Sequence, residues 1–240
     1  NLNGTISEIL IAHPGQNLNN IDNTTNTHVL QGDTTTNVLS ELGVFSIASC
    51  SIAGGVNLTL PTAGTKNGWV GAGQIVSGGT SIPVGTTVVS VSGTAVVLSA
   101  ACTNGAGQTI VFDNDIQVSG GVVVLHPYLF VYGNYGLIQN CSASNIYDWV
   151  SATTNKTNVS STKIVKGLPV RGGTNSPSGL FWALDSLIRV SFTPTTVTTG
   201  STSSTFYWRY DIVTSQSSIL SSSSVIEYDG IYYWIGVDRF

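Results

Sequence analysis

Three acidic residues near the end of the chain are of the type that hydrolysis of a glycosidic bond requires. Asp211, Glu227 and Asp229 lie on or near neighbouring strand-like stretches, and a glycosidase uses two carboxyl groups held about 5–9.5 Å apart. Asp229 is followed by Gly230, however, and an Asp-Gly pair is a common hairpin turn. An enzyme that cleaves surface polysaccharide is therefore our third hypothesis, behind two that need no catalysis.

A run of oxygen-bearing side chains, Asp113-Asn114-Asp115, could bind calcium. It lacks the following glycine and the distant glutamate of an EF-hand loop. Asp and Asn commonly bond their own backbone in turns, so a turn is the favoured interpretation. The histidines are too far apart in the sequence to suggest a metal site; they are His13, His28 and His126. We expect no metal and no cofactor.

The three cysteines form no Cys-x-x-Cys pair and lie far apart: Cys50, Cys102 and Cys141. Neither a zinc knuckle nor a redox motif is indicated, and at most one disulfide can form within the chain. Buried thiols are the favoured interpretation. The sequence also lacks the Gly-x-Ser-x-Gly, His-Glu-x-x-His and phosphate-binding Gly-x4-Gly-Lys-Ser/Thr motifs. We therefore predict that the chain is not an enzyme and has no catalytic residues.

Four arginines fall near the expected edges of sheets: Arg171, Arg189, Arg209 and Arg239. They could face a channel and contact phosphate groups of DNA without reading its sequence. The alternative is pairing with acids close by in the sequence, which are Asp185, Asp211 and Asp238. The balanced charge of this part of the chain favours pairing.

The elements that must position these residues are indicated by one apolar, aromatic phrase that occurs three times. It covers residues 129–138, 180–188 and 225–234, with starts 51 and 45 residues apart. A two-stranded hairpin that returns every ~40–50 residues is typical of one blade of a β-propeller. Gly133-Asn134 and Asp229-Gly230 are expected to supply the positive φ of the hairpin turns. The aromatic residues of the phrase and its surroundings are expected to pack blade against blade: Phe130, Trp182, Tyr207, Trp208, Tyr233 and Trp234.

Residues 64–113 are expected to form a small inserted β module. Residues 86–91 and 95–99 are β-branched runs joined across Gly93-Thr94, which predicts a hairpin, and residues 108–112 add a strand. Residues 1–63 are expected to be an N-terminal β segment, with a short helix at 36–42 as an alternative. The Ser/Thr-rich stretches 151–162, 193–205 and 214–224 are expected to be surface loops.

The composition favours a structural or extracellular particle protein with a large partner interface. Charged residues make up 8% of the chain and the net charge is −4, whereas an ordinary soluble domain has about 25% charged residues. No basic patch of the kind that reads duplex DNA is present, and no stretch of 18 apolar residues predicts a membrane span. Because the chain begins at Asn1 and contains no Met, we expect a processed or partial sequence. Because residues 237–240 fall in an apolar, aromatic stretch without a cap or tail, we also expect it to be incomplete at its C-terminus.

Residues 116–240 resemble a family of bacteriophage virion proteins. The resemblance is carried by the run KGLPVRGG at 166–173, by residues 176–190, and by residues 217–240. These stretches are similar in style to those of the propeller-containing tail nozzle, or DNA-stabilisation, proteins of short-tailed phages. Residues 77–98 resemble small β modules found in phage structural proteins.

The resemblance implies a non-enzymatic component of a phage tail, located in the virion. It would form a homo-oligomeric ring around the DNA channel, contact other tail or connector proteins, and touch passing DNA without reading its sequence. The expected fold is all-β, with part of a β-propeller-like array of antiparallel blades over residues 114–240. The second hypothesis is an adhesin or decoration module, in which residues 64–113 bind a host surface glycan or protein.

Overall fold

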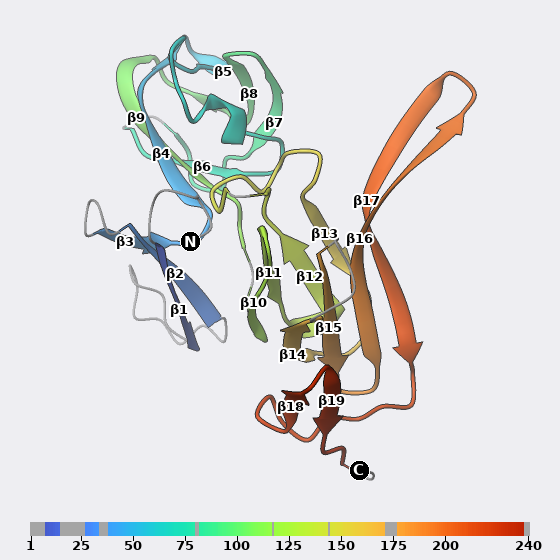
Figure 1. Ribbon diagram of the computed structural model, residues 1–240. Helices are drawn as coiled ribbons and strands as arrows, with labels where there is room; N and C mark the ends of the chain where they lie inside the picture. Colours follow the sequence, from blue (N-terminus) through green and yellow to red (C-terminus); the bar gives the residue numbers. More distant parts are fainter. Residues whose placement is uncertain are drawn as a thin grey trace.

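The computed structural model describes residues 8–14, 27–33, 38–79, 82–116, 118–143, 145–170 and 177–237, with side chains from residue 41 onward. All of the strands pair in antiparallel fashion. The helical segments of this described part are two single 3-10 turns, η1 (Asn67–Trp69) and η2 (Asn134–Gly136). The predicted all-β class is therefore confirmed (Figure 1). Neither turn, and thus no helix among the described residues, could cross a membrane.

The N-terminal strands form a three-stranded meander. Its strands are β1 (Glu8–Pro14), β2 (Thr27–Asp33) and β3 (Val38–Glu41), paired in the order β1-β2-β3. Residues 38–41 are therefore extended, although part of the alternative helix at 36–42 lies outside the described residues.

A six-stranded sheet follows and curves into a nearly closed barrel, at the top of Figure 1. Its order is β6-β9-β4-β5-β8-β7, and a bridge between Ile75 and Thr87 brings its two outer strands together. The strands are β4 (Val44–Ile52), β5 (Gly55–Thr59), β6 (Ile75–Ser77), β7 (Val88–Ser92), β8 (Ala95–Cys102) and β9 (Gly105–Asp113). The boundary expected between residues 63 and 64 thus falls inside this barrel, because β4 and β5 are two of its strands.

Alternating side chains fill the interior of the barrel. On β4, Phe45 and Ile47 are buried while Ser46 between them is not, which is the period of two that a one-sided strand requires. Phe45 stacks on Phe112 of β9 with ring centroids 5.5 Å apart. The predicted hairpin across Gly93 joins β7 to β8, and Gly93 has a φ of 60°. The barrel therefore has a core of its own.

Two four-stranded meanders lie below the barrel, and a two-stranded hairpin follows them. The first meander consists of β10 (Gly121–Leu125), β11 (Tyr128–Tyr132), β12 (Leu137–Asn140) and β13 (Asn155–Asn158). The second consists of β14 (Ile164–Pro169), β15 (Ser178–Ala183), β16 (Leu187–Thr199) and β17 (Thr202–Thr214). The hairpin is β18 (Val225–Tyr228) and β19 (Ile231–Trp234). The three copies of the repeated phrase are hairpins in all cases, β11–β12, β15–β16 and β18–β19, as predicted.

These three sheets are stacked in sequence order through aromatic side chains. Phe181, on β15, points toward the first meander and lies 5.5 Å from the ring of Tyr132 and 6.1 Å from that of Phe130. Its neighbour Trp182 points to the opposite side and contacts β19. Both residues are fully buried, because the second meander is covered on both faces. A Cβ atom at Gly167 would lie 2.9 Å from the Tyr132 ring, so glycine permits this close approach of the sheets.

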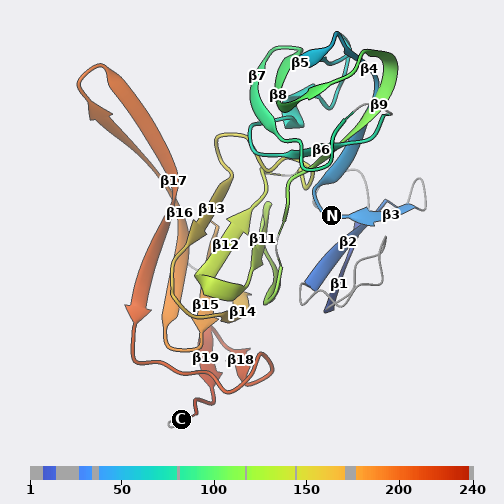
Figure 2. The same cartoon turned by 180° about the vertical axis from the view of Figure 1, so that it is seen from behind.

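The prediction that residues 193–205 form a loop is wrong. These residues are the ends of β16 and β17, which extend as a hairpin beyond the body of the second meander (Figures 1 and 2). We call residues 193–206 the β-arm; all of them are exposed. A register shift between Phe192 and Thr195 marks its start, where Thr193 and Pro194 form a bulge. The polar stretch is extended because threonine is β-branched and favours strands.

The other loop predictions are partly correct. Residues 151–162 contain β13, whereas residues 215–224 contain no strand. The turn after β11 also differs from expectation: the positive φ angles fall on Tyr135 and Gly136, and Gly133 has a φ of 179°. The Asp229-Gly230 turn is as predicted, with φ angles of 50° and 76°.

Candidate interaction site

The β18–β19 hairpin carries an apolar hollow, and the conformation of its turn sets the geometry of the hairpin. Asp229 and Gly230 both adopt positive φ, the geometry that tight two-residue hairpins need. The Gly230 N–H donates to Oε1 of Glu227 at 2.9 Å, which fixes the start of the turn. The register pairs Val225 with Trp234 across the hairpin. This local chemistry sets which side chains share a face.

One face of the hairpin is attached to the second meander. Trp182 lies with its ring centroid 5.9 Å from both Tyr232 and Trp234. The Tyr232 hydroxyl donates to the carbonyl of Pro169 at 2.7 Å, and Val225 is buried in the same cluster. The hairpin is therefore held rigidly by packing and by one hydrogen bond to β14.

The opposite face is exposed and apolar. Opposed residues of an antiparallel pair point to the same side, so the pairs Ile226–Tyr233 and Tyr228–Ile231 share this face. With Ile235 they are 47–73% exposed. We call these five residues the outer face. Tyr233 was expected to pack between sheets, but it cannot, because alternation sends it away from the side that Trp234 occupies.

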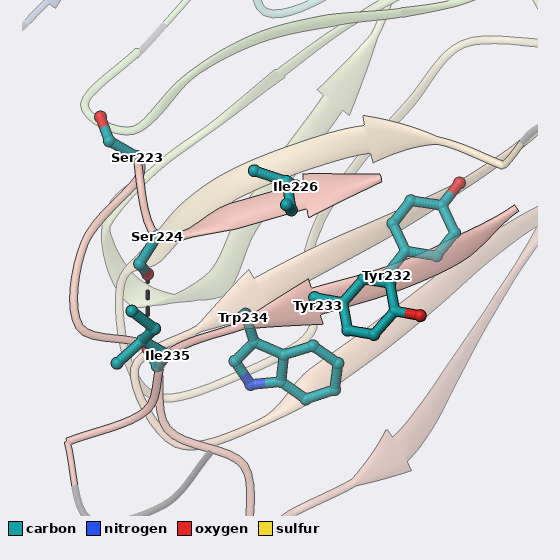
Figure 3. Close-up of a pocket in the computed structure, with 7 residues that line it drawn as sticks. All are labelled: Ser223, Ser224, Ile226, Tyr232, Tyr233, Trp234 and Ile235. Carbon is teal, nitrogen blue, oxygen red and sulfur yellow. Dashed lines mark hydrogen bonds between the residues drawn. The ribbon is translucent and has the colours of Figure 1, made fainter. Parts of the chain in front are cut away.

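A hollow of about 600 Å³ opens along this hairpin (Figure 3). It is lined by Ser223, Ser224, Ile226, Tyr232, Tyr233, Trp234 and Ile235. The lining is mostly hydrocarbon and aromatic ring and contains neither a carboxyl, an imidazole nor a cation. Such a surface can bind apolar or aromatic groups.

The three acids of the glycosidase hypothesis are not gathered at this hollow. Asp211 belongs to β17 of the second meander, whereas Glu227 belongs to the separate β18–β19 sheet. Asp211 accepts from Nε of Arg209 at 2.8 Å, and Asp229 is a turn residue. Each carboxylate therefore has a local structural use.

The arginines of the sequence analysis differ in their partners and positions. Arg209 is paired with Asp211, as the alternative interpretation predicted. Arg189 is exposed on β16, in register with Asp211 on the neighbouring strand. Arg171, Arg239 and the acid Asp238 lie outside the described residues.

The Asp113-Asn114-Asp115 run forms the predicted turn. Oδ1 of Asp113 accepts from the Asp115 N–H at 2.8 Å. The Asn114 amide donates to the carbonyl of Gly43 at 2.6 Å and accepts from Gln74 at 2.8 Å. Burial raises the pKa of the Asp113 carboxyl above its ordinary value, and the charge of Asp115 adds to this rise while the Asp115 N–H opposes it. These bonds join the barrel to the segment that leads to the first meander.

The histidines and cysteines show no metal-binding arrangement within the part of the chain that is described. His126 is exposed between β10 and β11, and the side chains of His13 and His28 lie outside the description. All three cysteines are buried, as predicted: Cys50, Cys102 and Cys141. Burial raises the pKa of the Cys50 and Cys102 thiols, which makes their reactive thiolate forms rare near neutral pH.

A second, more polar hollow of about 290 Å³ lies where the barrel meets the first meander. Gln74 and Asn114 come from the barrel side, and Gln139, Trp149 and Lys156 come from the meander side. Gln74 is 2% exposed and satisfied by bonds to Trp69 and Asn114. These bonds fix the barrel side of the hollow.

The β-arm and the outer face are the features that the sequence analysis did not predict. A signal for the β-arm was present in its threonines, seven of the fourteen residues, because threonine favours strands over loops. No alternation of apolar and polar residues marked the outer face, because residues 225–234 place apolar side chains on both faces of the hairpin. Comparisons with protein-family models, with curated proteins and with solved structures found no match for this chain.

Proposed function

We propose that this protein is a non-enzymatic structural subunit of a virus particle, and that its meanders are consecutive blades of a β-propeller-like array. One observation carries the proposal: the sheets β10–β13, β14–β17 and β18–β19 stack face to face in the order in which they occur in the chain. Sequential stacking of four-stranded antiparallel sheets is how propeller blades are built. In this interpretation β18 and β19 are the first two strands of a third blade.

The proposed setting is a phage tail, where copies form a ring around the DNA channel. The setting comes from the resemblance of residues 166–190 and 217–240 to tail nozzle proteins. A stack of blades suits this role because most strand edges are internal and the cores interlock, which makes the unit stiff. The low proportion of charged residues, 8%, suits a protein whose surface is largely covered by neighbours.

Contact with DNA in such a ring would be non-specific. Arg189 is exposed on β16 and could approach a phosphate, whereas Arg209 already has Asp211 as a partner. The expected consequence is weak, salt-sensitive binding without sequence preference.

Two experiments test the proposal. Mass spectrometry of purified particles from the source of the sequence should detect the chain in a copy number that fits a ring. Negative-stain images of the purified protein should show rings with radially arranged blades. A protein that stays monomeric and is missing from particles would refute the proposal. If the protein instead binds host cells through residues 44–113 while remaining monomeric, the adhesin hypothesis replaces it.

A further inference from the structure

The β-arm is a two-stranded ribbon with no second layer. All residues from 193 to 206 are exposed, and both views show the arm standing away from the rest of the molecule (Figures 1 and 2). An isolated two-stranded hairpin is marginally stable in water and usually needs a covering layer. An arm of this length is therefore best explained as an element that packs on something outside its own chain.

The two sides of the β-arm differ. On one side hydroxyls are bonded across the strands, Thr196 to Thr205 at 2.9 Å and Thr198 to Ser203 at 3.0 Å. The other side carries the large apolar groups, Val197 at 50% and Phe206 at 60% exposure. Neither side has a charged residue. The arm thus has one side that is satisfied by its own hydrogen bonds and one that exposes apolar area.

The outer face of β18–β19 also exposes apolar area that no layer covers within the described residues. Taking about 200 Å² for a whole side chain of this size, its five residues expose on the order of 600 Å². That equals the largest apolar patch of a typical monomer, about 300–600 Å², and is somewhat below the ~800 Å² that each partner buries in a standard interface. The apolar side of the arm, with Val197 and Phe206, would be the opposing surface.

We propose that the apolar side of the β-arm of one copy packs on the outer face of β18–β19 of the next copy. The two surfaces lie at opposite ends of the second meander (Figures 1 and 2), so they cannot meet within one chain. Both are uncharged, so no like-charge repulsion opposes the contact. On the outer face, Tyr228 and Tyr233 carry hydroxyls that can bond Thr195 and Thr199, which lie on the same side of the arm as Val197.

A contact between two different surfaces is heterologous, and it closes into a ring when the rotation between copies permits. The inference therefore deepens the proposed ring assembly and rests on it. It commits to a second copy of this chain as the occupant. The stacking order supports this occupant, because the outer face is the next free layer in a series of sheets that already pack face to face.

Cross-linking between introduced cysteines tests the contact. In a Val197→Cys/Tyr233→Cys double variant, mild oxidation should give a ladder of dimers, trimers and larger species on a non-reducing gel. The Val197→Cys and Tyr233→Cys single variants should stay uncross-linked, because a heterologous contact does not bring two like positions together. The three native thiols are buried and serve as an internal control.

The alternative results each have a definite meaning. Cross-linking in Val197→Cys alone would show arm meeting arm, and cross-linking in Tyr233→Cys alone would show the outer face meeting its own copy; either overturns the inference. If light scattering finds oligomers but the double variant gives no ladder, the ring assembly survives and the arm contact is refuted. If the protein is monomeric at high micromolar concentration, both are refuted.

Charge variants provide a second measurement. Val197→Glu and Ile226→Glu should each weaken association roughly tenfold or more, because burying an unpaired charge is costly. Thr198→Glu is the matched control on the hydroxyl side of the arm and should change association little. The Val197→Lys/Ile226→Glu pair should recover part of the loss. Equal effects of Val197→Glu and Thr198→Glu would contradict the assigned side of the arm.

Discussion

The attachment of β18–β19 to the second meander depends on Trp182, and substitution of this residue should show it. Trp182 is fully buried between the hairpin and the inner sheet. Replacing a buried Trp by Ala typically costs about 3–5 kcal/mol. We expect a loss of that size in Trp182→Ala, measured by urea denaturation followed by circular dichroism.

A conservative substitution gives the sharper result. The indole N–H of Trp182 is buried and has no acceptor among the described residues, whereas the N–H of Trp208 donates to the carbonyl of Thr153 at 2.8 Å. A buried donor without a partner costs about 1–3 kcal/mol. Trp182→Phe removes that cost, whereas Trp208→Phe removes a hydrogen bond.

The two Trp→Phe variants lose the same atoms, so the difference between their free energies of unfolding reports on the indole N–H. We expect Trp208→Phe to be more destabilising than Trp182→Phe by about 1–3 kcal/mol. A double-mutant cycle of Trp182→Ala with Trp234→Ala should give a coupling of about 0.5–1.5 kcal/mol. Equal costs for the two Phe variants, together with no coupling in the cycle, would refute the described packing.

Three further outcomes follow from the described contacts. Asp113→Asn keeps an acceptor for the N–H of residue 115 but removes a charge whose pKa is raised in the folded state, so that the ionised carboxyl disfavours the fold. The variant should therefore be more stable than the parent at pH 7, and this gain should vanish below the ordinary pKa of 3.8. Denaturation at several pH values will measure both. Gly230→Ala places a side chain at a φ of 76° and should cost about 1–2 kcal/mol in thermal or urea unfolding, and no loss would show that the turn has another conformation. The thiols of Cys50, Cys102 and Cys141 should react with a thiol reagent at pH 8 many times faster in denaturant than in the folded protein, and rapid labelling without denaturant would contradict their burial.

The features that sequence alone predicted are those set by neighbouring residues. The hairpins at Gly93 and at Asp229-Gly230 were predictable because turn chemistry and the strands around it are local. In both hairpins a short stretch contains the whole cause.

The features that the sequence analysis missed depend on strands that pair over a long sequence distance, or on which face of a strand a residue occupies. Strands β4 and β5 join the barrel because β4 pairs with β9, some 60 residues later, and no local pattern marks that pairing. Tyr233 and Trp234 are similar in type, yet alternation packs Trp234 partly buried against the second meander and leaves Tyr233 exposed. The turn at Gly133 was predicted correctly, but its backbone geometry was not, because the glycine with positive φ is Gly136.

The outer face of β18–β19 is apolar although it lies at the end of the stack of sheets. A hairpin at the end of a stack of sheets could expose serine and threonine on its outer side, as the β-arm does at Thr196 and Thr198. Instead β18–β19 places isoleucine and tyrosine on both of its strands, at 51–73% exposure. Exposed apolar area of this extent lowers solubility in a protein with few charges. The hydroxyl-rich β-arm lies at the opposite end of the second meander (Figures 1 and 2), and in the proposed ring assembly it would cover this apolar area on a neighbouring copy.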